Sequence, residues 1–154
     1  MVEGKVSKVG NFKVLPFSIR HDCAEPFGFV INHKDTGNIL FATDTYYLPN
    51  RFANLSHIMI EANYSQEVID RNVREGSVSQ FLRDRTMQSH MSIDTCIEAL
   101  LANDLNKVQT IVLLHLSDRN SDEKGFQEQV ESATGIQTFV ANKGLEIELK
   151  KYPF

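Results

Sequence analysis

The sequence has 154 residues, of which 42% are hydrophobic and 23% charged, so we expect one globular domain with a sizeable buried core. Its net charge of -4 argues against a broad basic face for nucleic acid, although a local site stays open. The two cysteines, Cys23 and Cys96, give neither a disulfide framework nor a four-cysteine zinc site. No apolar run has the length of a membrane span and the N-terminus lacks a signal-peptide core, so we expect a cytoplasmic protein without a membrane partner.

The first half of the sequence predicts a meander of short strands. Alternating apolar residues and turn residues indicate two strands within residues 1–17, a polar loop over 18–26, and strands at 27–32, 39–42 and 58–60. The strand at 39–42 ends abruptly in Thr43-Asp44-Thr45, and the strand at 58–60 ends in Glu61.

The second half changes to a helical period. We expect helices at 66–75, 92–103 and 122–134, strands at 108–114, 136–140 and 145–149, and either helix or loop over 77–89. Ser65 and Ser92 are candidate N-caps, and Gly76 and Gly135 end two of the helices. Strand–helix alternation after a meander favours an α/β or α+β layered fold, with a mixed β-sheet flanked by helices, in a single domain over 1–154.

Asp44 follows a buried strand, at the kind of edge where α/β proteins collect chemistry. A carboxylate is costly to bury unpaired, so Asp44 needs a metal, another cation or several N–H donors there. The alternative interpretation is an Asx-turn that ends the strand and has no chemical role.

Other polar residues occupy comparable positions. His21, Glu61 and His115 fall at the ends of expected strands or in the loop beside one, and His90 directly precedes a helix. Two histidines and a carboxylate at adjacent strand ends suit zinc, manganese or iron. We therefore expect His21, Asp44 and His115 at one edge of the sheet, and Glu61 within hydrogen-bonding reach of His90. His33 and His57 have no partner by spacing and are left out of the site.

Five short motifs in order give a resemblance. They are His21-Asp22-x-x-Glu25-Pro26, Thr43-Asp44-Thr45, Glu61-Ala62-Asn63, His90-Met91-Ser92 and Leu113-Leu114-His115-Leu116-Ser117. This order resembles the metallo-β-lactamase-fold hydrolases. It is similar, more narrowly, to their nuclease-like bacterial and phage branch and to the transfer-RNA 3′-processing endonucleases.

The resemblance implies roles for the same residues. It implies that His21 binds one zinc (or manganese) ion, Asp44 bridges two, and His115 binds the second. It also implies that Glu61 orients His90, which donates a proton to the leaving group. The substrate implied is a phosphodiester or a nucleic acid.

One family motif is missing. The sequence contains no His-x-His-x-Asp-His segment, and only 20 residues precede His21. The resemblance therefore covers the C-terminal half of the fold, a partial αββα sandwich with an incomplete ligand set. Because the inner face would then expose residues such as Val14 and Ile39, we expect a homo-oligomer or a complementary N-terminal-half chain as partner.

Two hypotheses stay open. The first is a truncated or split metal-dependent hydrolase, phosphodiesterase- or nuclease-like, whose isolated chain is inactive and in which the metal is absent until a second chain completes the site. The second is a catalytically inactive module of the same fold that acts in binding or assembly. Fold analogy alone does not decide between them.

Overall fold

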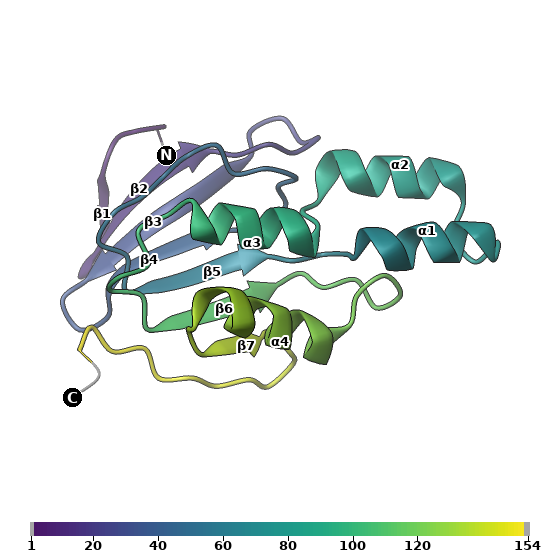
Figure 1. Cartoon of the computed structure of the whole chain (residues 1–154). Coiled ribbons are helices and arrows are strands. Elements are labelled where there is room, and N and C mark those ends of the chain that lie inside the picture. Colours follow the sequence, from purple (N-terminus) through teal and green to yellow (C-terminus); the bar gives the residue numbers. More distant parts are fainter. Residues whose placement is uncertain (1, 153–154) are drawn as a thin grey trace.

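The computed structural model describes residues 2–152, and its strands form one seven-stranded sheet in which spatial order follows chain order (Figure 1). The strands are β1 (Ser7–Val9), β2 (Phe12–Ser18), β3 (Phe27–His33), β4 (Gly37–Ala42), β5 (His57–Glu61), β6 (Thr110–Leu114) and β7 (Thr138–Val140). This α/β architecture is the predicted one.

The sheet is antiparallel in its first half and parallel in its second. Strands β1 to β4 pair as a meander, with Phe29 opposite Phe41, whereas β4 to β7 run parallel, with Ala42 opposite Ile60. The carboxyl ends of β4, β5 and β6 therefore lie at one edge. Strand β2 runs in the same direction as β4, so the loop that follows β2 reaches this edge as well.

Each helix begins at a polar N-cap whose side chain accepts a backbone N–H. The helices and their caps are α1 (Gln66–Arg74) after Ser65, α2 (Gln80–Ser89) after Ser79, α3 (Ile93–Leu101) after Ser92 and α4 (Glu123–Thr134) after Asp122. Gly135 ends α4 in the left-handed conformation, at φ 70°. The segment that the sequence left as helix or loop is thus mostly helix α2.

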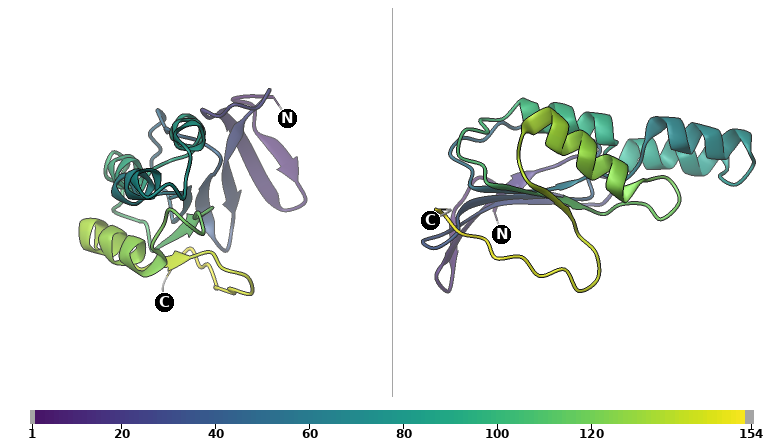
Figure 2. Two further views of the ribbon diagram at one scale, coloured as in Figure 1. Left: turned by 90° about the vertical axis from the view of Figure 1, so that its right-hand side faces the viewer. Right: turned by 60° about the horizontal axis from the view of Figure 1, so that its bottom comes forward.

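The helices α3 and α4 cover one face of the sheet, and the pair α1 and α2 extends past the edge where the parallel strands end (Figures 1 and 2). Alternate strand residues such as Leu40, Ile60 and Leu113 point into the core between sheet and helices, against Leu100 and Phe126. No helix within residues 2–152 is long and apolar enough to cross a membrane.

The chain after β7 is not the predicted strand. Residues 145–149 have no strand partner and run as coil past the face of the sheet that the helices leave uncovered (Figure 2). The backbone of this segment is held by other groups: the Lys150 carbonyl lies 3.1 Å from His57 Nε2, and the Lys151 carbonyl accepts from Gln109 Nε2 at 2.7 Å. Apolar alternation predicted a strand at 145–149, but in the structure the chain is anchored just beyond this range, at Lys150 and Lys151, and does not pair with the sheet.

The uncovered face is less exposed than the sequence predicted. Val14 and Ile39 are only 9% and 8% exposed, and Phe29 and Phe41 are half-buried. The expectation that Val14 and Ile39 are exposed is wrong, because neighbouring strands and the passing C-terminal segment cover much of this face.

Candidate metal centre

A hollow of about 300 Å³ lies at the edge where the parallel strands end. It is lined by four residues singled out from the sequence, His21, Asp44, His90 and His115, and by residues of α2. The prediction that His21, Asp44 and His115 lie at the same edge of the sheet is confirmed. The parallel pairing of β4, β5 and β6 explains it, because parallel strands bring their carboxyl ends together.

Glu61 is the centre of the hydrogen bonding beside this hollow. Its side chain is fully buried. Oε1 accepts from His90 Nδ1 at 2.7 Å and from His115 Nδ1 at 3.0 Å, and Oε2 accepts from the Thr45 backbone N–H at 2.7 Å. The predicted proximity of Glu61 and His90 is confirmed, and the sequence did not predict the two further donors.

These hydrogen-bond donors determine whether the carboxyl group of Glu61 is ionised. Burial opposes ionisation of Glu61, but the hydrogen bonds from His115, His90 and the Thr45 N–H outweigh it, so the pKa of Glu61 is lowered. The hydrogen bond to Glu61 in turn raises the pKa of His115, against the opposing effect of burial. Glu61 is therefore a carboxylate at neutral pH, and a carboxylate can only accept hydrogen bonds.

It follows that Nδ1 of both histidines carries the proton and that Nε2 of each is free to bind another group. Asp44, His90 and His115 each offer one ligand atom, and these atoms all lie within 4.8 Å of one another. Two imidazoles and a carboxylate are the donors of catalytic zinc sites, which use three protein ligands and an open position. A histidine whose second nitrogen donates to a buried carboxylate is the usual support for such a ligand. These residues therefore fit a divalent metal ion.

This ligand set differs in one member from the predicted one. His90, predicted as a proton donor, belongs to the group of three, while His21 lies beside it. His21 Nδ1 lies 3.0 Å from the Ser89 carbonyl and Nε2 lies 3.2 Å from Asp22 Oδ1. The rings of His21 and His90 are 5.4 Å apart between centroids. His21 thus lines the hollow with both nitrogens already facing acceptors.

Two of these side chains extend from unusual backbone. Asp44 has φ 55° and His115 has φ 58°, in the left-handed region that non-glycine residues rarely adopt. Asn63 Nδ2 donates to the His115 carbonyl at 2.6 Å and so holds that turn. Non-glycine residues in this region cluster at functional sites.

Some residues of the site had no signal in the sequence analysis. Thr45 is fully buried; besides the N–H to Glu61, its hydroxyl accepts from the Arg20 N–H at 3.0 Å and donates to the Tyr47 carbonyl at 2.8 Å. Arg85 and Leu82 line the hollow from α2, a segment whose apolar pattern was too weak to place. The Thr43-Asp44-Thr45 turn indicated a role for Asp44 but did not indicate that the Thr45 N–H donates to Glu61.

No protein-family model and no curated protein match this chain. Solved structures do. YhfI from Bacillus subtilis, a metallo-β-lactamase-fold protein, superposes with a TM-score of 0.66 at 10% identity, over 94% of this chain and 53% of that one. Igni18, a metallo hydrolase from Ignicoccus hospitalis, gives 0.61 at 16% identity, over 96% and 60%. A diphosphatase from the PhnP family gives 0.61 at 15% identity, over 97% and 49%.

These similarities show the fold. The chain has a metallo-β-lactamase-like α/β architecture and spans about half to three fifths of the length of the structures it matches. The fold predicted from the five motifs is thereby confirmed.

Proposed function

We propose that this chain is a metal-dependent hydrolase module of the metallo-β-lactamase type that acts on phosphodiesters. The observation that supports this best is the shared carboxylate: Glu61 Oε1 accepts from both His90 and His115, and these two histidines and Asp44 each offer a ligand atom within 4.8 Å of the others. Two structurally similar proteins are described as a metallo hydrolase and a diphosphatase. The finer resemblance, to nuclease-like and transfer-RNA-processing enzymes, rests on the sequence motifs.

Asp44, His90 and His115 would hold the metal, with zinc or manganese as the candidates. A bound divalent ion would polarise the phosphoryl oxygens and lower the pKa of water. The protein's own contribution is orientation, because Glu61 fixes the tautomer and the ring of both histidines, and the Thr45 N–H fixes Glu61. Arg85 is at the rim, 65% exposed and 3.6 Å from Asp22, where an incoming phosphate would compete for it.

His90 has two candidate roles that experiment can separate. As a metal ligand, its loss would weaken metal binding. As the proton donor implied by the resemblance, its loss would slow only substrates whose leaving group needs protonation. We therefore propose to assay His90→Ala on two substrates, bis-p-nitrophenyl phosphate and a dinucleotide, in the presence of a polypeptide that contains the absent motif. Equal losses on both, together with weakened zinc binding, would identify a ligand; a loss confined to the dinucleotide would identify a proton donor.

We further propose that a second polypeptide or a second copy of the chain completes the site. The half-buried apolar residues on the uncovered face of the sheet, among them Phe29, Phe41 and Met59, support this. The absent His-x-His-x-Asp-His motif favours a second polypeptide as the source of those ligands, because a second copy of the chain lacks the motif as well. Light scattering in dilute solution should give a mass above that of the monomer, and a monomer mass would contradict self-association.

A module that binds without turnover is the second candidate. It is favoured by the missing motif, and by the hydrogen bonds of His90 and His115 to Glu61, which join three segments of the chain. In that case the site would be a structural network.

Metal titration tests the proposal directly. We expect the chain to bind one zinc or manganese ion by calorimetry, and Asp44→Asn to weaken binding at least about tenfold because an anionic ligand is lost. Asp22→Asn is the matched control: Asp22 lines the same hollow outside the group of three and should leave the affinity nearly unchanged.

Turnover of bis-p-nitrophenyl phosphate then separates the two candidates. We expect little hydrolysis by the chain alone, and a rise on adding a polypeptide that contains the absent motif. Metal binding without turnover under either condition would favour the binding module. No metal binding by the wild-type chain, alone or with that polypeptide, would contradict the metal site itself.

A further inference from the structure

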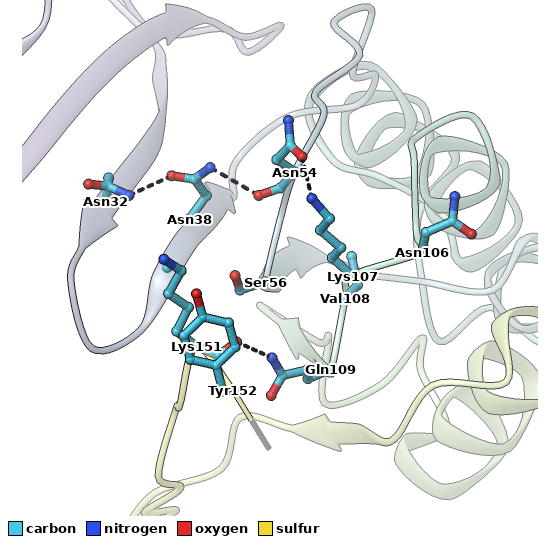
Figure 3. Close-up of a pocket in the computed structure, with 11 residues that line it drawn as sticks. Asn32, Asn38, Asn54, Ser56, Asn106, Lys107, Val108, Gln109, Lys151 and Tyr152 are labelled. Carbon is cyan, nitrogen blue, oxygen red and sulfur yellow. Dashed lines mark hydrogen bonds between the residues drawn. The ribbon is translucent and has the colours of Figure 1, made fainter. Parts of the chain in front are cut away.

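A second and larger hollow, of about 660 Å³, lies at the opposite end of the parallel strands (Figure 3). Its wall comes from the start of β4, the segments leading into β5 and β6, and the C-terminal residues Lys151 and Tyr152. Its volume is in the range of sites that hold small molecules. None of the residues assigned to the metal centre lines it.

The lining has a distinct chemical composition. Carboxamides, two lysines, a serine and a tyrosine contribute, and among residues 2–152 no carboxylate does. This is unexpected in a chain with 20 acidic and 16 basic residues. The described lysine–carboxylate pairs are Lys124 with Glu128 and Lys150 with Glu148, so neither Lys107 nor Lys151 is neutralised within the part of the chain that the structure describes.

The polar groups are held in place before any ligand arrives. Asn32 Nδ2 donates to Asn38 Oδ1 at 2.8 Å, Asn38 Nδ2 donates to the Asn54 carbonyl at 2.9 Å, and Lys107 Nζ donates to Asn54 Oδ1 at 2.9 Å. Figure 3 shows these side chains arranged in sequence along one side of the hollow. Such a network keeps the Lys107 ammonium directed at the site and lowers the entropic cost of binding.

A flat apolar surface lies on the other side. Tyr152 is 66% exposed, and Lys151 Nζ lies 5.0 Å from the centroid of its ring. Figure 3 shows Lys151 and Tyr152 together, beside Gln109 and across the hollow from Asn54 and Lys107. A cation beside an exposed aromatic ring suits a ligand that has both a negative charge and a ring able to stack.

The floor of the hollow is kept open by Gly37. This residue has φ 75°, and a Cβ placed on it would collide with the Ser56 hydroxyl. The absence of a side chain at Gly37 therefore leaves the backbone and the Ser56 hydroxyl accessible from the hollow.

The geometry points to a second binding site, for a small phosphate-bearing ligand with a stacking ring, of the nucleoside monophosphate class. Lys107 and Lys151 contact the phosphate, Tyr152 stacks on the ring, and the carboxamides of Asn54 and Gln109 hydrogen-bond the polar edge of the ring or the sugar. The site needs no metal ion and is independent of the chemistry at the other end of the strands.

The test uses the full chain in EDTA, so that the metal centre contributes nothing. Adenosine monophosphate, inorganic phosphate and adenosine are titrated separately by calorimetry, and the side-chain amide signals of asparagine and glutamine are followed by NMR. We expect saturable binding of adenosine monophosphate, weaker binding of the other two, and shifts of the Asn54 and Gln109 side-chain amides.

Variants assign the binding to this hollow. Lys107→Gln and Lys151→Gln should each weaken adenosine monophosphate binding about tenfold, as expected for a lost charge-assisted hydrogen bond. Lys124→Gln on α4 is the matched control, and Arg85→Gln tests the metal-centre hollow; neither should change the affinity. Backbone amide spectra check that each variant is folded.

Three results would overturn the assignment. They are the absence of saturable binding of adenosine monophosphate, affinity that depends on Arg85 and not on the two lysines, and equal affinities for adenosine and adenosine monophosphate. Failure here would leave the proposed hydrolase untouched, since that function depends on metal binding by Asp44, His90 and His115.

Discussion

The two ends of strand β5 hold buried ionisable side chains in opposite electrostatic conditions. His57 begins the strand and Glu61 ends it, at 1% and 0% exposure, and both point to the face of the sheet away from the helices. Glu61 accepts from three donors. His57 Nε2 lies 3.1 Å from the Lys150 carbonyl, and its Nδ1 has no hydrogen-bond partner in the described part of the chain.

Glu61 and His57 tolerate burial for different physical reasons. Glu61 keeps its charge because its donors replace water, whereas His57 is held neutral because burial lowers its pKa against the opposing effect of the Lys150 and Thr36 carbonyls. A paired charge at one end is held in a network of three hydrogen bonds. A neutral ring at the other end costs less to bury and secures the C-terminal segment.

Replacement of Glu61 is expected to have the largest effect on the free energy of unfolding. Glu61→Ala removes the acceptor of three donors and should lower the free energy of unfolding by about 3 kcal/mol. Urea denaturation in EDTA at pH 7 measures it. Glu98→Ala, on the exposed side of α3, is the control and should change stability by less than about 0.5 kcal/mol. Equal stabilities for the two variants would mean that the network contributes nothing to folding.

Gly37, at the start of β4, and Gly76, just after α1, form a matched pair of left-handed glycines. Their φ angles are 75° and 76°, but only at Gly37 would a Cβ meet another group, the Ser56 side chain. Gly76→Ala should cost about 1 kcal/mol, from backbone strain alone. Gly37→Ala should cost about 2 to 3 kcal/mol, because overpacking adds to the strain. Thermal unfolding of both variants measures the difference, and equal losses would show that Ser56 moves aside freely.

The smallest expected effect is a pH dependence that belongs to His57. Its pKa is lowered in the folded state, so the unfolded chain binds the proton more readily, and stability should fall as pH drops below about 6.5. The lowered pKa of Glu61 changes stability below about pH 4.5, and the raised pKa of His115 changes it above about pH 6.5. The pH dependence of stability between these two values is therefore expected from His57.

The variant His57→Gln isolates this effect. Glutamine retains a donor for the Lys150 carbonyl but does not titrate. Urea midpoints in EDTA between pH 7 and pH 5.5 should decline less for His57→Gln than for the wild type, while Lys124→Gln keeps the wild-type slope. Identical slopes in all three proteins would exclude His57 as the source.

The success of the sequence analysis differed between these regions for physical reasons. His21, Asp44 and His115 could be predicted at one edge because each follows an apolar strand or lies in the loop beside one, and parallel strands align their ends. The direct contact of Glu61 with His115 could not be predicted, since it depends on the left-handed turn at His115. The larger hollow, lined by Asn54 and Gln109 among others, could not be predicted either, because asparagines in loops resemble ordinary turn residues.

Helix α2 and residues 145–149, the two segments that the apolar pattern did not place correctly, share a property. Helix α2 exposes Phe81 at 78% and Leu82 at 48%, so its apolar residues do not mark a buried face. Residues 145–149 alternate like a strand and yet lie along the sheet without joining it. In both cases local pattern is overridden by where the chain passes relative to the sheet.

The left-handed backbone at Asp44 and His115 predicts which residues a selection for folding alone would favour at these two positions. A library randomised at these positions and chosen only for solubility should drift towards glycine or asparagine, which adopt φ 55° and φ 58° with less strain. Aspartate and histidine should return only when survival depends on the chemistry of the site. The ratio of the two outcomes would measure the free energy of folding that aspartate and histidine cost at these positions relative to glycine or asparagine.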